Sequence, residues 1–213
     1  MGDFVFKNGE KVVFIGDSIT DCGRRYEFAP FGNGYVKMVI DLITAKYPDR
    51  KITFYNKGIG GNTVEDLFNR WYDDVLALNP DWVSVKIGIN DVHRSLSTNP
   101  PVLPPDKFRK FYSDILSQTK AKTKAKLILI EPFYISNDNS DSWRGRVLKI
   151  LPHYIKVVHE MSKIYKTILV PIHSVFQNHL KYRPSDYFAP EPVHPYSNGH
   201  LIIAYEILKR LKW

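Results

Sequence analysis

The chain has 213 residues, of which 44% are apolar, and a net charge of +8. This length suits one domain with a sizeable core, and the apolar content argues against a disordered protein. The sequence has no signal-peptide pattern, no apolar run that could span a bilayer, and only one cysteine, Cys22. We therefore expect a single cytoplasmic domain, residues 1–213, with no membrane partner.

Strands and helices are expected to alternate along the chain. Apolar runs predict five strands, and their lack of polar alternation indicates a parallel sheet that is buried on both faces. Helical patterns separate them, with Thr63 and Ser197 as candidate caps and Pro152 marking a kink or a helix start. The expected strands cover residues 11–16, 52–56, 82–87, 126–131 and 167–172, and the expected helices cover about 35–43, 63–78, 105–120, 143–165, 173–182 and 197–211.

Five β-α units predict a three-layer α/β/α sandwich. The connections 88–104 and 132–143 are unusually long, and both follow predicted strands. They should lie over the carboxyl edge of the sheet, where open α/β sheets bind their ligands. The densest basic run, residues 120–126, falls at a predicted helix end, where lysines suit the helix dipole. Without a nucleic-acid recognition motif, we predict no nucleic-acid partner.

Ser18 follows the first predicted strand and is the candidate nucleophile. His194, in a proline-rich loop before the last helix, is the candidate base, and Glu191 could orient its imidazole. The Ser18 N–H, the Gly61 N–H and the Asn90 amide could form an oxyanion hole, since all three positions follow strands. Each residue alone could be an ordinary turn or loop residue. Their joint occurrence after successive strands favours catalysis.

The candidate residues lie in four short motifs: Gly16-Asp17-Ser18, Gly60-Gly61-Asn62-Thr63, Gly88-Ile89-Asn90-Asp91 and Glu191-Pro192-Val193-His194-Pro195. Together these motifs resemble those of the SGNH (GDSL-type) hydrolases. The resemblance spans nearly the whole chain and implies a flavodoxin-like five-stranded parallel sheet in the order 2-1-3-4-5. It also implies that Ser18 is the nucleophile, that Gly61 and Asn90 complete the oxyanion hole, and that His194 is the base.

One position departs from the family pattern, which usually has aspartate where this chain has Glu191. Glutamate serves as the third member in some Ser-His hydrolases. Asp186 is an alternative partner for His194, and a Ser-His dyad oriented by a backbone carbonyl is another.

Longer segments of the sequence are most similar to bacterial cytoplasmic acetyl xylan esterases; they cover residues 14–24, 56–64, 79–85 and 132–135. This resemblance implies deacetylation of short sugar chains by a homo-oligomer. Asp17, Tyr134 and Trp143 are candidate substrate-binding residues. The two aromatic residues are candidates because aromatic faces stack on sugar rings. Arg24, Arg94 and Arg144 are further candidates for contact with a polar or acidic substrate, and the sequence does not rank them.

We expect no cofactor and no metal, since Asp17, Asp91 and His93 lack the spacing of metal ligands. Three other functions stay open. A lysophospholipase or thioesterase would use the same residues on longer acyl chains. A carbohydrate-binding relative would have lost catalysis through Glu191. A basic nucleic-acid-binding module would bind with steep salt dependence.

Overall fold

The computed structural model describes residues 4–213. The first three residues of the N-terminal segment, in which a signal-peptide pattern would begin, lie outside the described residues. The sheet has five parallel strands in the order β2-β1-β3-β4-β5, as predicted. The strands are β1 (Lys11–Gly16), β2 (Thr53–Gly58), β3 (Trp82–Lys86), β4 (Lys126–Ile130) and β5 (Ile168–Val170). The sequence placed all five, with boundaries that differ by at most two residues.

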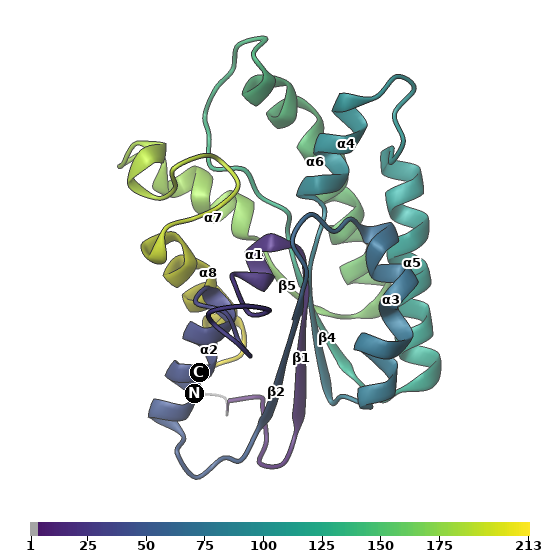
Figure 1. Cartoon of the computed structure of the whole chain (residues 1–213), viewed down its shortest axis with the longest axis vertical. Coiled ribbons are helices and arrows are strands. Elements are labelled where there is room, and N and C mark those ends of the chain that lie inside the picture. Colours follow the sequence, from purple (N-terminus) through teal and green to yellow (C-terminus); the bar gives the residue numbers. More distant parts are fainter. Residues whose placement is uncertain (1–3) are drawn as a thin grey trace.

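Helices cover both faces of the sheet, which confirms the three-layer sandwich (Figure 1). α2 and α8 pack together on one face, and α3, α5 and α6 cover the other. The helices are α1 (Ser18–Asp21), α2 (Tyr35–Lys46), α3 (Val64–Asp74), α4 (Ile89–Ser97), α5 (Pro105–Lys122), α6 (Trp143–Tyr165), α7 (Ile172–His179) and α8 (Ser197–Arg210), with 3-10 turns η1 (Leu76–Leu78) and η2 (Ser185–Tyr187).

The core consists of the strands and the inner helix faces. Val13, Phe14, Val83 and Ile128 are fully buried, which follows from a central parallel sheet that is covered on both sides. Thr63 caps α3 as predicted, in a reciprocal pair with Asp66.

Three local predictions need correction. Residues 88–104 are not a simple loop, because α4 occupies the first half; its buried Ile89 and Val92 lie on one helix face. Ser197 is the first residue of α8 and does not cap it. α6 runs unbroken through Pro152, so this proline does not mark the helix start.

None of the helices formed by residues 4–213 combines the length and the apolar character that crossing a bilayer requires. The carboxyl ends of the strands, α1, α4 and the beginning of α6 lie at the same end of the molecule (Figure 1). The predicted site residues are therefore gathered from distant parts of the sequence at one edge of the sheet.

Candidate active site

Ser18 is held at the carboxyl end of β1 by a tight change from strand to helix. Asp17 caps α1, and its Oδ1 accepts the Ile19 N–H at 3.0 Å. Gly16 lies so close to β3 that a Cβ atom there would be 2.2 Å from the Lys86 carbonyl oxygen. A side chain at this position would push the neighbouring strand away, so glycine is required by close approach.

A buried ion pair lies directly behind Ser18. The ammonium of Lys86, at the end of β3, contacts both Asp17 carboxylate oxygens at 3.1 and 3.3 Å. Both side chains are fully buried. Asp17 therefore cannot reach a substrate, and its prediction as a substrate-binding residue is wrong. Its position inside the protein shows that it instead anchors the turn that carries Ser18.

His194 and Glu191 come from the loop between η2 and α8. The Nε2 atom of His194 lies 2.8 Å from the Ser18 hydroxyl oxygen. On the other side of the ring, Nδ1 is hydrogen-bonded to Glu191 Oε1. The three side chains thus form a continuous chain from carboxylate to imidazole to hydroxyl, the geometry that can remove a proton from the serine.

The Glu191 carboxylate is fixed by its own loop. The backbone N–H groups of Val193 and His194 each donate to it at 2.8 Å. Partial burial favours the neutral acid, but these hydrogen bonds and that of the imidazole outweigh it, and together they lower the pKa of Glu191. A carboxylate at this place favours the Nδ1-protonated imidazole, which leaves Nε2 free to accept a proton. Asp186 forms no hydrogen bond with His194.

The three predicted oxyanion-hole donors are the N–H groups of Ser18 and Gly61 and the side-chain amide of Asn90. Gly61 follows β2 with a φ of +79°, a backbone conformation that side chains disfavour. Among residues 4–213, the N–H groups of Ser18 and Gly61 donate to no protein acceptor. The Asn90 amide, in the first turn of α4, donates one hydrogen to the Asn62 carbonyl at 3.0 Å and keeps a second available.

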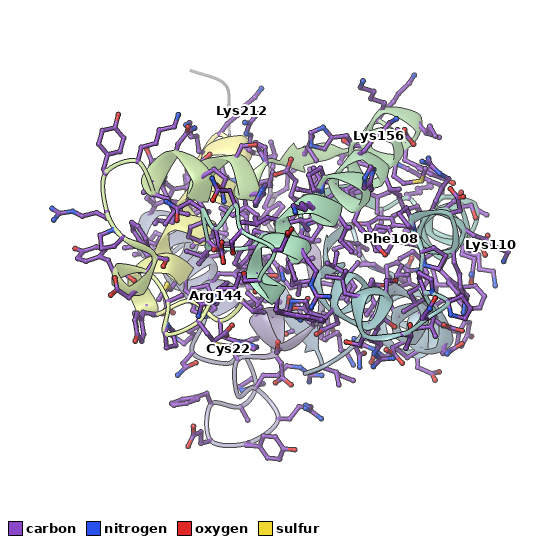
Figure 2. All side chains as sticks on the ribbon, turned by 90° about the horizontal axis from the view of Figure 1, so that it is seen from above. Cys22, Phe108, Lys110, Arg144, Lys156 and Lys212 are labelled. Carbon is purple, nitrogen blue, oxygen red and sulfur yellow. The ribbon has the colours of Figure 1, made fainter. Side chains whose placement is uncertain are left out.

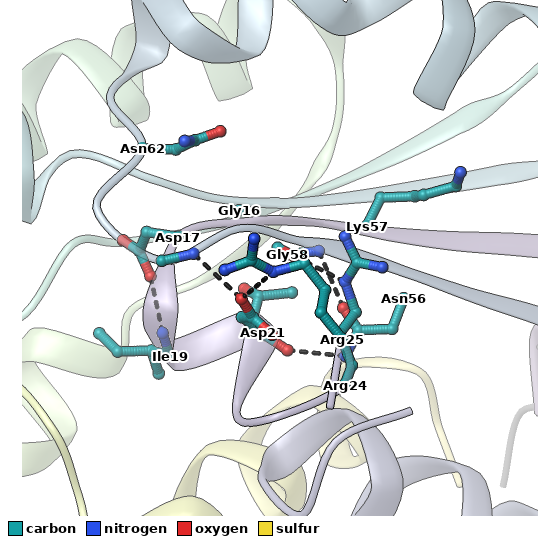
Figure 3. A network of polar contacts seen from close by, with 12 residues as sticks. Gly16, Asp17, Ile19, Asp21, Arg24, Arg25, Asn56, Lys57, Gly58 and Asn62 are labelled. Carbon is teal, nitrogen blue, oxygen red and sulfur yellow. Dashed lines mark hydrogen bonds and ion pairs between the residues drawn. The ribbon is translucent and has the colours of Figure 1, made fainter. Parts of the chain in front are cut away.

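A polar network holds the loop that carries Gly61, and Figure 3 shows it from close by. Asp21 accepts the Gly60 N–H at 3.1 Å and the Arg25 Nε–H at 2.8 Å. Arg24 donates to the Gly58 carbonyl at 2.6 Å. No local sequence pattern indicates the contact between Asp21 and Gly60, because the two residues lie 39 positions apart. The network positions one predicted oxyanion donor relative to Ser18.

Aromatic side chains form one wall near these residues. The ring of His93, on α4, meets Tyr134 edge-on at 5.9 Å and Trp143 at 5.8 Å between ring centroids. Trp143 is 37% exposed, although the Arg146 guanidinium lies over its ring at 5.4 Å, whereas Tyr134 is only 3% exposed. Burial lowers the pKa of His93, with smaller influences from Glu191 and His194. The sequence did not mark His93 as part of this wall.

Within the part of the chain that the structure describes, no cluster of three or more metal-binding side chains is present. Asp91 is buried and accepts the Val64 N–H at 3.0 Å. Asp17 is engaged by Lys86. The carboxylates of Asp17 and Asp91, the two that could have bound a metal together with His93, therefore both have partners inside the protein.

Residues 14–202 match the GDSL-like lipase/acylhydrolase family. The chain belongs to this family. The five-stranded sheet and the Ser18-His194-Glu191 arrangement accord with this membership, and the chain is a carboxylic ester hydrolase.

This GDSL-family chain is 39% identical to an acetylxylan esterase of Geobacillus stearothermophilus, over 96% of this chain and 94% of that protein. Its fold is similar to the crystal structure of Axe2, an acetylxylan esterase from the same organism, with a TM-score of 0.89. The two sequences are 37% identical, and the match covers 97% of this chain and 96% of the Axe2 chain. Catalytic mutants of Axe2 replace a serine, an aspartate or a histidine by alanine. LAE5, an alpha/beta hydrolase enzyme from the metagenome of Lake Arreo, Spain, is also similar, with a TM-score of 0.88, 31% identity and coverage of 99% and 98%.

Proposed function

We propose that this chain is a serine esterase that removes acetyl groups from carbohydrates, in particular from acetylated xylo-oligosaccharides. The observation that carries the proposal is the 2.8 Å contact between Ser18 Oγ and His194 Nε2, with Glu191 behind the imidazole. The similarity to an acetylxylan esterase over 96% of the chain supports the substrate class. The partial exposure of Trp143 supports it further, because aromatic rings pack on sugar rings.

In the proposed reaction, Ser18 Oγ attacks the ester carbonyl carbon while His194 Nε2 takes the hydroxyl proton. The carbonyl oxygen becomes negative and accepts hydrogen bonds from the Ser18 N–H, the Gly61 N–H and the Asn90 amide. His194 then gives its proton to the sugar oxygen, the C–O bond breaks, and the acetyl group stays on Ser18. Water, deprotonated by His194, attacks this acyl-enzyme and releases acetate.

Glu191 is the proposed third member of the triad, in place of an aspartate. The Glu191 carboxylate meets the imidazole and two backbone N–H groups at once, which supports this role. The contact between the Glu191 carboxylate and His194 Nδ1 supports Glu191 over the two alternatives, Asp186 and a dyad oriented by a backbone carbonyl.

The test is acetate release from acetylated xylo-oligosaccharides, together with hydrolysis of p-nitrophenyl acetate and p-nitrophenyl octanoate. Ser18→Ala protein serves as the blank. We expect turnover that depends on Ser18 and favours the acetate ester. A preference for octanoate would point to a lipase or thioesterase instead, and sugar binding without any turnover would point to a carbohydrate-binding relative.

We also propose that the protein is a cytoplasmic homo-oligomer. Leu201 and Tyr205 on α8 are 49% and 57% exposed, which supports a contact between copies. The single free thiol of Cys22 is compatible with a reducing compartment. Light scattering coupled to size-exclusion chromatography would measure the oligomeric state, and a monomer mass would overturn that part of the proposal.

A further inference from the structure

A pocket of about 300 Å³ lies directly beside the catalytic array, and Glu191 forms part of its lining. Arg144, from the beginning of α6, and Ser185 and Asp186, from η2, contribute the other polar groups. The volume is at the lower end of the range for small-molecule sites. The proposed reaction does not use this pocket, although it shares Glu191 with it.

The structure separates the three arginines that the sequence left equivalent. Arg24 is bonded to the Gly58 carbonyl, and Arg94 donates to the Gly61 carbonyl at 3.2 Å and lies 3.7 Å from Asp66. Arg144 is exposed and, within residues 4–213, forms neither a hydrogen bond through its side chain nor an ion pair. Among the three, only the Arg144 guanidinium has no hydrogen-bond or ion-pair partner within residues 4–213.

The place of Arg144 in α6 gives no benefit to the helix. It is the second residue of a 23-residue helix whose N-terminus is already capped by Ser142. A cation in the first turn is opposed by the helix dipole, which favours negative charge there. Figure 2 looks down on this end of the molecule and labels Arg144. Helix stability therefore does not explain the arginine.

The lining of the pocket matches a neutral sugar better than a free anion. Arg144 offers only donors, the carboxylates of Asp186 and Glu191 offer only acceptors, and the Ser185 hydroxyl offers both. Sugar hydroxyls donate and accept, so they can satisfy such a mixed set, whereas an anion would be repelled by two carboxylates. Prolines in the lining loop restrict its backbone, which lowers the entropy lost on binding.

We propose that this pocket is a second sugar subsite, which holds the ring next to the acetylated ring of an oligosaccharide. Arg144 donates hydrogen bonds to its hydroxyls and Asp186 accepts one. This inference rests on the proposed esterase function and adds a preference for substrates of two or more rings. Glu191 belongs both to the lining of the pocket and to the hydrogen-bonded chain that ends at Ser18, so a ring held in the pocket lies next to the catalytic residues without taking part in the chemistry.

The test compares three substrates, acetylated xylobiose, acetylated xylose and p-nitrophenyl acetate, in wild-type, Arg144→Met and Arg210→Met proteins. Arg210 is an exposed arginine at the C-terminal end of α8, whereas His194 precedes the N-terminal end of this helix. A helix of 14 residues is about 20 Å long, so the Arg210 variant removes the same charge far from the pocket. We expect Arg144→Met to raise KM for acetylated xylobiose about tenfold with kcat unchanged. The other two substrates, and Arg210→Met on all three, should behave as wild type. Asp186→Asn should show the same selectivity with a smaller effect.

Two results would overturn the subsite. The first is an Arg144→Met protein whose preference for acetylated xylobiose over acetylated xylose equals that of wild type. The second is an equal loss on all three substrates, which would mean that Arg144 acts through Glu191. If wild-type protein released no acetate from either acetylated sugar in a Ser18-dependent manner, the proposed function itself would fail. The two failures are therefore distinguishable.

Discussion

The ammonium of Lys86 lies 3.1 Å from Oδ2 of Asp17, and neither side chain is exposed to solvent. Lys86 ends β3 and Asp17 follows β1, so the pair joins two central strands immediately behind Ser18. Burial lowers the pKa of Lys86, while the charge and hydrogen bonds of Asp17 and the charge of Asp91 counteract that effect. The arrangement fixes the backbone from which the Ser18 hydroxyl projects.

Lys86→Met should destabilise the protein by about 3–5 kcal/mol, because it leaves the Asp17 carboxylate buried without its counter-ion. Urea unfolding, followed by circular dichroism, measures the free energy of unfolding. The double variant Asp17→Asn/Lys86→Met should recover much of the loss, since no unpaired charge remains. A single variant as stable as wild type would show that the pair contributes nothing.

Replacing Glu191 tests the unusual third member of the triad. Glu191→Gln should lower kcat for p-nitrophenyl acetate by roughly 10³–10⁴-fold, because a neutral amide no longer favours the required tautomer or stabilises the imidazolium. Glu191→Asp keeps the charge and should retain more activity than Glu191→Gln. Thermal unfolding curves would verify that both variants are folded. Similar kcat values for Glu191→Gln and wild type would favour a Ser-His dyad.

Asn90→Ala should lower kcat by about 10²–10³-fold with little change in KM, because the amide would bind the oxygen only after it becomes negative. Steady-state kinetics with p-nitrophenyl acetate separate the two parameters. Asn90 also donates to the Asn62 carbonyl, so the Gly61 loop should be checked by a crystal structure of the variant. A rise in KM at constant kcat would instead assign Asn90 to substrate binding.

Asp91 should make stability depend on pH. Burial raises the pKa of Asp91 to about 7. The charges of Asp17 and Asp66 raise this pKa further, whereas hydrogen bonds from the Val64 and Asp91 N–H groups lower it. An unfolded aspartate titrates near pH 4, so between about pH 4 and 7 the folded protein holds a proton that the unfolded chain has released. The contribution of Asp91 to stability therefore falls as the pH rises through this window.

Asp91→Asn removes this titration and keeps an oxygen that can accept the Val64 N–H. Relative to wild type, the variant should gain more than about 1 kcal/mol in the free energy of unfolding between pH 4.5 and pH 8. Urea unfolding at the two pH values measures this gain, and comparing the two proteins cancels the titration of other groups. An equal difference at both values would contradict the prediction.

Much of the architecture could be read from local patterns. The buried strands appear as continuous apolar runs, and Thr63 appears as a cap before a helix with acids in its first turn. The order of Ser18, Gly61, Asn90 and His194 after successive elements predicted that they meet at one sheet edge. Each of these predictions rests on residues that are close together in the sequence or on the order of helices and strands along the chain. Both can be read from the sequence without knowing the three-dimensional structure.

Only the tertiary structure decided which distant groups pair. The sequence could not show that Lys86 reaches Asp17, that Asp21 holds Gly60, or that Arg24 and Arg94 are engaged while Arg144 is not. These outcomes depend on distances across the sheet and between loops, because the same carboxylate or guanidinium can serve a ligand or an internal partner. The sequence by itself determined the fold class and the residues of the candidate triad. Packing decided which polar side chains are enclosed and which are left for a substrate.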